Sequence, residues 1–114
     1  MIVLKINTYE DDNYIIFPFT DIDSLIDESN QMHNCVRTYV EEIINYKCFI
    51  YFMRYKDSTD KSLVTVEVKN NEVVQARRKF NENITEEDRL FLNKFERNYT
   101  PILIGEENIK KIFR

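Results

Sequence analysis

The stretch SLVTVEVKNNEVVQARR at positions 62–78 decides the fold. Its first half, Ser62–Val68, places a valine at every second position, which predicts a strand with one buried face. Asn70 and Asn71 follow, and asparagine tolerates the left-handed backbone that a two-residue hairpin loop requires. The chain then returns in residues that favour a strand over Glu72–Arg78. The stretch therefore predicts an antiparallel hairpin.

A two-residue loop sets the register of this hairpin, because it fixes which residues of the two strands lie opposite each other. The expected cross-strand pairs are Val68 with Val73, Val66 with Gln75, and Val64 with Arg77. Gln75 and Arg77 are therefore expected on the valine face of the sheet, with Thr65 and Glu67 on the other face. Each polar group on a covered face needs a hydrogen-bond partner, since an unpaired one costs roughly 1–3 kcal/mol.

The rest of the chain adds a central strand and two main helices. Cys48–Tyr55 is almost wholly apolar or aromatic, as expected for a strand that is covered on both faces. Val36–Lys47 has apolar residues at helical spacing, and Glu86–Asn98 follows a capping box formed by Thr85 and Asp88. With the hairpin, these elements predict a single α+β domain over the 114-residue chain, in which two main helices pack on an antiparallel sheet.

The N-terminal part adds two strands and a shorter helix. Met1–Thr8 alternates apolar and polar residues, and Tyr14–Phe17 is rich in strand-forming residues and is stopped by Pro18. These two segments can pair as a hairpin. Thr20 is a suitable N-cap for a short helix that ends near Asn30.

Composition excludes several classes of protein. Hydrophobic residues make up 43% of the chain and charged residues 32%, which is typical of a folded soluble domain. The net charge of −4 argues against a strongly basic nucleic-acid surface, without excluding nucleic acid as a partner. No segment resembles a membrane helix or a signal peptide, and two cysteines make no disulfide framework. We therefore expect an intracellular, reducing location, with no membrane partner and no cofactor.

The segment Gln31–Tyr39 collects residues that could form a site. It contains the only histidine, His33, and one of the two cysteines, Cys35, beside a candidate helix N-cap at Asn34. A helix dipole favours a thiolate in the first turn, and His33 could accept its proton. We favour the alternative that Cys35 only fills space in the core. Cys48 would make three zinc ligands, but a closed site needs four, so we expect no metal.

A basic run could instead bind phosphate. Arg77–Lys79 lies next to Phe80 in the sequence, and Arg54 lies near the end of the strand expected over Cys48–Tyr55. Guanidinium groups match phosphate oxygens, and an aromatic ring can stack on a base. The alternative is a solvated strand end.

Short polar motifs, taken in their order along the chain, resemble the core of PcfJ-like proteins. They are Met32-His33-Asn34-Cys35-Val36 followed by Tyr39, a strand that ends in Arg54, Thr65-x-Glu67, Gln75-x-Arg77, and Asn81. The resemblance covers about Phe17 to Phe95. PcfJ-like proteins are encoded on conjugative plasmids, phages and other bacterial mobile elements, and most of them are much longer. This chain therefore resembles a stand-alone signature domain.

The resemblance implies a polar signature in this chain. Its positions are His33, Asn34, Cys35, Tyr39, Arg54, Thr65, Glu67, Gln75, Arg77 and Asn81. Family members tend to have glycine at two positions where this chain has Arg37 and Arg78. If those glycines allow a ligand to approach closely, this chain keeps the fold and has an altered site.

Two hypotheses about function follow. The preferred one is a non-catalytic binding module of a plasmid or phage, which engages a bacterial protein or nucleoprotein complex in the host cytoplasm. An inhibitor of host defence, such as an anti-CRISPR, is a special case. The alternative is an enzyme that performs nucleotide transfer, nucleic-acid cleavage or thiol chemistry. Its candidate catalytic residues are His33, Cys35, Tyr39 and Glu67, and its candidate binding residues are Asn34, Arg54, Thr65, Gln75, Arg77 and Asn81. The oligomeric state stays open.

Overall fold

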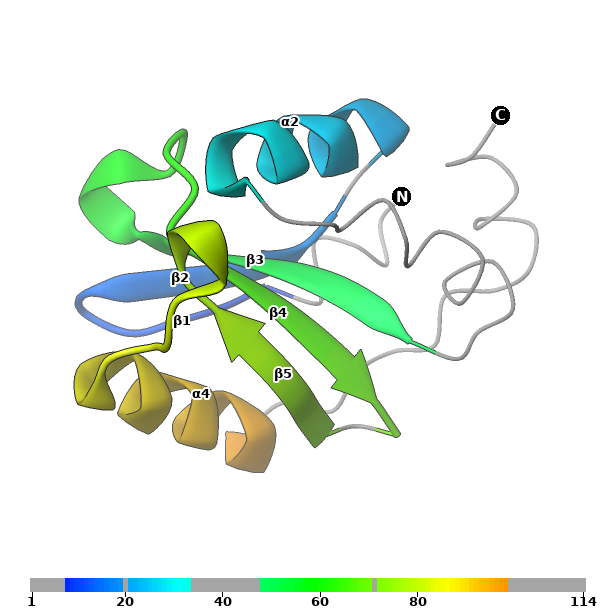
Figure 1. The fold of residues 1–114 in the computed structure, drawn as a ribbon. Coiled ribbons are helices and arrows are strands. Elements are labelled where there is room, and N and C mark those ends of the chain that lie inside the picture. Colours follow the sequence, from blue (N-terminus) through cyan, green and yellow to red (C-terminus); the bar gives the residue numbers. More distant parts are fainter. Residues whose placement is uncertain (1–7, 20, 34–47, 71, 99–114) are drawn as a thin grey trace.

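The computed structural model describes residues 8–19, 21–33, 48–70 and 72–98, which form an antiparallel sheet between two helices (Figure 1). The five strands follow each other in the order β1-β2-β3-β4-β5. They are β1 (Tyr9–Glu10), β2 (Tyr14–Pro18), β3 (Phe49–Tyr55), β4 (Val64–Lys69) and β5 (Glu72–Arg77). The helices are α2 (Ile22–Met32) and α4 (Glu86–Asn98), with 3-10 turns η2 (Lys56–Ser58) and η3 (Lys79–Asn81). This arrangement confirms the predicted α+β fold.

The sheet has an apolar core on each face, because its strands alternate side chains between α2 and α4. On the α2 side, Phe19, Leu25, Cys48, Ile50 and Phe52 pack together. On the α4 side, a larger cluster gathers the valines of β4 with aromatic residues of β2, β3 and α4. Ile16, Met53 and Val66 are completely buried within this cluster. The central strand β3 is therefore covered on both faces, as its apolar sequence predicted.

Helix α2 begins and ends at identifiable caps. Asp21 is the N-cap of α2, because its side chain accepts a hydrogen bond from the Ser24 backbone N–H at 2.7 Å and Ser24 closes a capping box. The predicted cap, Thr20, was therefore one residue too early. Likewise α2 runs past Asn30 to a left-handed C-cap at His33. Pro18 is the last residue of β2 rather than the residue that stops it.

The β4–β5 hairpin has the predicted turn and the predicted Val68–Val73 pair, but the predicted pairs of Val66 with Gln75 and of Val64 with Arg77 are wrong. Its pairs are Lys69 with Glu72, Val68 with Val73, Glu67 with Gln75, Val66 with Ala76, and Thr65 with Arg77. Val74 has no partner in this series, so it forms a β-bulge in β5. Side chains alternate along a strand, so one extra residue moves Gln75 and Arg77 to the face of Thr65 and Glu67. The small apolar Ala76 takes the buried place beside Val66 instead, which keeps polar groups out of the valine core.

Several predicted elements lie outside the described residues. They are the strand over Met1–Thr8 apart from its last residue, and the helix over Val36–Lys47. The hairpin partner of Tyr14–Phe17 among the described residues is the short strand β1, which pairs antiparallel with β2.

Candidate functional site

A buried carboxylate on α2 organises the polar side chains on one face of the sheet. Glu28 is 0% exposed. The guanidinium of Arg54 donates to it through Nη2 at 2.7 Å and through Nη1 at 3.4 Å. The hydroxyl groups of Ser62 and Thr65 donate at 2.6 and 2.7 Å. These four residues are called the Glu28 network, and its donors occupy both carboxylate oxygens.

Two aromatic rings enclose the arginine of the Glu28 network. The guanidinium carbon of Arg54 lies 5.7 Å from the centroid of the Phe17 ring and 5.1 Å from that of Phe52. The face of an aromatic ring attracts a cation electrostatically, so both rings stabilise the charged guanidinium. Two of the signature positions, Arg54 and Thr65, are thus engaged with Glu28 inside the fold.

Sequence reasoning missed Glu28, although one signal was present. Leu25, Glu28 and Met32 are three and four residues apart, so they share one face of a helix, and all three are buried. A carboxylate on an otherwise apolar helical face requires a buried cationic or hydroxyl partner. That partner, Arg54, is 26 residues away in the sequence, and only the fold shows the pairing.

A second buried carboxylate lies on the opposite face of the sheet. Asp88 accepts hydrogen bonds from Arg78 Nε at 2.8 Å, from the Tyr14 hydroxyl at 3.0 Å and from the Thr85 backbone N–H at 2.9 Å. These four residues are called the Asp88 network. The Thr85 hydroxyl accepts from the Asp88 N–H in return, so the predicted capping box is confirmed.

The Asp88 network shifts the pKa of its members in opposite directions. Burial alone would raise the pKa of Asp88, but hydrogen bonds from Arg78, the Thr85 backbone and Tyr14 hold it below the ordinary value. Burial and the neighbouring Asp88 carboxylate raise the pKa of the Tyr14 hydroxyl, which therefore stays protonated as a donor. The hydrogen bond to Asp88 likewise raises the pKa of Arg78.

Arg78 occupies one of the two positions at which the resemblance described above implied glycine. Its φ of −83° is ordinary for any residue, so the backbone does not require glycine here. The side chain turns to the α4 face, where it contacts Asp88 and the Tyr55 hydroxyl. The other such position, Arg37, lies outside the described residues.

The end of α2 packs against η3, and both segments contain residues with a left-handed backbone. His33, Phe80 and Asn81 have φ values of 51°, 60° and 59°, in the region that glycine prefers. The rings of His33 and Phe80 are stacked, with centroids 4.6 Å apart and planes at 17°. Phe80 is still 61% exposed, and the Lys79 ammonium lies 5.5 Å from its ring centroid. His33, Lys79, Phe80 and Asn81 are called the His33–Phe80 surface.

The remaining signature positions lie either on the α2 face of the sheet or outside the described residues. Glu67, Gln75 and Arg77 share the α2 face by register. The Glu67 carboxylate is buried, and one of its oxygens has no hydrogen-bond partner among the residues that the structure describes. The Lys69 ammonium lies 3.7 Å from this same oxygen. Asn34, Cys35 and Tyr39 lie outside the described residues.

The described part of the chain contains no group of three or more histidine, cysteine, aspartate or glutamate side chains that could hold a metal ion. Over the same residues, neither helix has the length and apolar character needed to cross a bilayer. Cys48 is completely buried in the core on the α2 side, whereas His33 is exposed.

Comparison with known proteins agrees with the resemblance that the motifs indicated. No curated protein and no solved structure shows significant similarity to the chain. The model of the family described as PcfJ-like protein matches residues 4–92, which is well over half of the chain. The match includes both buried networks and the His33–Phe80 surface. The chain therefore belongs to the PcfJ-like protein family.

Proposed function

We propose that this protein is a non-catalytic binding module of a bacterial mobile element, and that the His33–Phe80 surface contacts its protein or nucleoprotein partner. The observation that carries the proposal is the exposed ring stack on a left-handed backbone. Large aromatic side chains dominate binding energy at protein interfaces, and Phe80 presents most of its ring to solvent.

The backbone conformation of this surface supports a role in binding. A residue other than glycine in the left-handed region costs free energy, on the order of 1 kcal/mol or more for bulky side chains. Phe80 and Asn81 adopt this conformation in succession, and His33 adopts it on the facing helix end. Such residues persist where the surrounding structure holds them, and they are frequent at ligand-binding positions.

The two buried networks support binding rather than catalysis. In each of them the carboxylate is engaged by an arginine and by hydroxyl or backbone donors. These groups hold the helices to the sheet and thereby position the turn at η3. The ring of His33 meanwhile stacks on Phe80. The ionisable groups of both networks therefore serve as a rigid frame for an exposed surface.

Family membership and the net charge of the chain indicate which class of partner to expect. Membership of the PcfJ-like family is consistent with the plasmid or phage setting that the resemblance implied, and the chain carries a net charge of −4. An acidic protein is attracted to basic surfaces, such as those with which nucleoprotein complexes hold nucleic acid. An inhibitor of host defence, for example an anti-CRISPR that occupies such a surface, is the special case that fits both features.

Site-specific crosslinking tests the proposal. A photoreactive phenylalanine analogue at Phe80 should form one discrete adduct in bacterial cells that carry the mobile element. The matched control places the same analogue at Leu90, which is exposed to a similar degree on α4. Adducts from Phe80 but not from Leu90 support the proposal. No adduct at Phe80, or the same adducts at both positions, would overturn it.

The buried Glu67 oxygen favours one alternative, an enzyme that cleaves nucleic acid or transfers nucleotides. A carboxylate oxygen without a hydrogen bond is unusual in a folded protein and can mark a catalytic base. If the alternative holds, the purified protein will cleave or modify labelled single-stranded DNA or RNA, and Glu67→Gln will abolish the product. Absence of any product from the wild-type protein counts against the alternative and leaves the binding proposal in place.

A further inference from the structure

We propose that the His33–Phe80 surface, together with Arg77, binds a short stretch of single-stranded nucleic acid. One base stacks on the Phe80 ring, and Lys79 and Arg77 hold the phosphates next to it. This inference rests on the proposed binding function and names the part of a nucleoprotein partner that the surface contacts. Three features carry it: an exposed aromatic ring, two cations without a carboxylate partner, and the placement of ring and cations on one side of the molecule.

The Phe80 ring provides a platform on which a base can stack. Phe80 is 61% exposed, more than any other large hydrophobic residue that the structure describes. The His33 ring lies against it with centroids 4.6 Å apart, and the left-handed backbone fixes the direction in which the side chain leaves the chain. Every base has an apolar face, so an exposed aromatic ring binds single strands with little preference for sequence.

Two cations of the basic run next to this ring are not used by the fold. Arg54 and Arg78 are held in the Glu28 and Asp88 networks. Within the described part of the chain, neither Lys79 nor Arg77 forms an ion pair. The Lys79 ammonium lies 5.5 Å from the Phe80 ring centroid, and the Arg77 guanidinium donates only to the preceding carbonyl at 3.2 Å. Guanidinium and ammonium groups in this state can bind phosphate oxygens.

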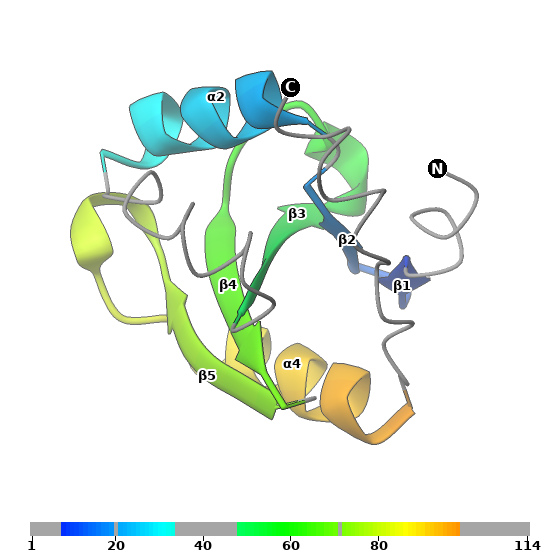
Figure 2. The same ribbon diagram turned by 90° about the vertical axis from the view of Figure 1, so that its right-hand side faces the viewer.

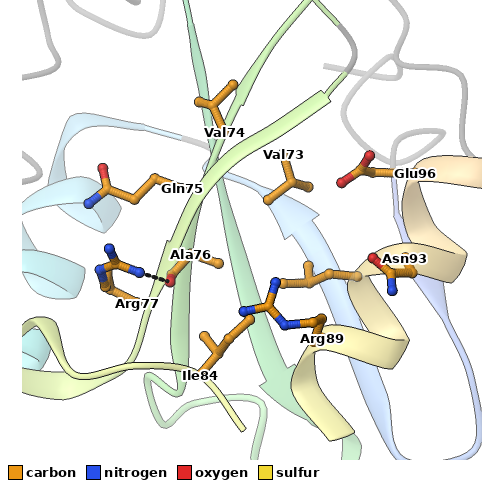
Figure 3. Close-up of a pocket in the computed structure, with 10 residues that line it drawn as sticks. Val73, Val74, Gln75, Ala76, Arg77, Ile84, Arg89, Asn93 and Glu96 are labelled. Carbon is orange, nitrogen blue, oxygen red and sulfur yellow. Dashed lines mark hydrogen bonds between the residues drawn. The ribbon is translucent and has the colours of Figure 1, made fainter. Parts of the chain in front are cut away.

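The fold places the ring and both cations on the same side of the sheet. By register, Arg77 lies on the α2 face of β5, and its side chain points away from the pocket between β5 and α4 (Figure 3). β5 leads into η3, which packs beside the C-terminal end of α2 (Figure 2). Arg77 and Phe80 are three residues apart, so their backbones lie within roughly 11 Å of each other. Neighbouring nucleotides of one strand can therefore contact both residues.

The local charge favours an anion, although the whole chain carries a net charge of −4. Two carboxylates are buried on this side of the sheet, and each has its own cation: Arg54 for Glu28, and Lys69 for Glu67 at 3.7 Å. Exposed Glu82 is the carboxylate closest to the ring in the sequence, and the two unpaired cations outnumber it. A ligand that joins a planar ring to an anion fits this surface, and a nucleotide has both in one unit.

Fluorescence anisotropy with the full-length chain tests the stacking. The probes are labelled twelve-base oligo(dT) and oligo(rU), and the control strand has the same length and an abasic sugar at every position. At least one strand with bases should bind about tenfold more tightly than the abasic strand, because only bases can stack. Phe80→Leu should weaken binding by about the same factor. Phe80→Tyr keeps the ring and should bind like the wild-type protein.

The salt dependence of binding tests the two cations. Lys79→Gln and Arg77→Gln should each lower the slope of log affinity against log salt by about 0.7, as expected for the loss of one phosphate contact with a single strand. Glu82→Gln should strengthen binding roughly twofold, a gain that a damaged fold would not produce. Arg89→Gln is the matched control, because Arg89 is exposed on the α4 side of β5 (Figure 3), and it should change neither the affinity nor the slope.

Three outcomes overturn the inference: no binding of either strand with bases, equal binding of the abasic strand, or an effect of Arg89→Gln as large as that of Lys79→Gln. The crosslinking experiment at Phe80 separates the inference from the proposed function. An adduct that a nuclease shortens supports both. An adduct with protein alone leaves the binding module standing and overturns the nucleic-acid inference. Absence of any adduct, together with no binding of the oligonucleotides, removes both.

Discussion

The two faces of the sheet carry the same chemical motif in different surroundings. Each has a completely buried carboxylate, Glu28 or Asp88, that is held by an arginine and by hydroxyl groups. On the α2 face, the arginine side chain is 6% exposed and lies between two aromatic rings. On the α4 face, the arginine side chain is 27% exposed. The Glu28 network is thus sealed, while the Asp88 network reaches solvent.

This difference determines what happens when a partner is removed. A charge that is left inside a sealed network has no water to replace the lost partner, so the cost of removal is large. A charge at the edge of a network can be hydrated by a small movement of its side chain. The burial of the Glu28 network also shows that the fold itself can require a signature position such as Arg54, because the partner of Arg54 is the buried Glu28.

The largest expected effect comes from Arg54→Met, which leaves Glu28 buried without its cation. We expect the free energy of unfolding to fall by about 3–5 kcal/mol, the usual cost of removing one partner from a buried ion pair. Urea denaturation at pH 7, followed by circular dichroism, measures it. Adding Glu28→Gln to Arg54→Met removes the orphaned charge and should recover part of the loss. A loss below about 1 kcal/mol for Arg54→Met would show that the network is not sealed.

Asp88→Asn should have a smaller effect. The variant loses the charge that pairs with Arg78 and weakens the cap of α4, and we expect a loss of about 2 kcal/mol. It costs less than Arg54→Met because the partly exposed Arg78 can turn toward solvent. Glu87→Gln is the matched control on the same helix turn, and should change the free energy of unfolding by less than about 0.5 kcal/mol. If Asp88→Asn destabilises as much as Arg54→Met, the contrast between the two faces is wrong.

The pH dependence of stability follows from the lowered pKa of Asp88. A carboxyl group with a lower pKa in the folded state binds protons more tightly when unfolded, so acid favours unfolding. The stabilisation is complete above the unfolded pKa, which is about 3.9, and is lost as the pH falls through the lower folded pKa. The wild-type free energy of unfolding, measured from pH 7 to pH 2.5, should therefore decline below about pH 5. Asp88→Asn should flatten this decline, and an unchanged slope would exclude Asp88 as its source.

The contrast between the networks also explains what the sequence could predict. The strands β2 to β5, the Asn70 turn and the Thr85–Asp88 cap depend on residues close together in the chain, and local patterns predicted them. The family could be predicted from the order of short motifs. The Glu28 network depends on partners 26 to 37 residues apart, which no local pattern connects.

The β-bulge could not be predicted for a related reason. A regular hairpin with a two-residue loop would have put Gln75 opposite Val66, inside an apolar cluster. Bulging at Val74 leaves a half-exposed valine but brings Ala76 into the core. That choice depends on packing against α4, so it belongs to the tertiary structure. The left-handed residues of η3 were missed because their sequence contains no glycine.

The smallest expected effects concern Asn81, which is the last residue of η3. Glycine adopts a φ of 59° without a side-chain clash but loses more freedom on folding, so Asn81→Gly should change stability by less than about 0.5 kcal/mol. Asn81→Ala should lose about 1 kcal/mol, because alanine has a β-carbon that opposes the left-handed region and lacks the amide that helps asparagine there. Thermal and urea unfolding compare the two variants. If both lose the same amount, the Asn81 amide makes a stabilising contact. If only alanine is destabilising, the position is constrained by its backbone. The turn then holds Phe80 beside His33 through backbone geometry, whereas the two faces of the sheet are held by buried charge.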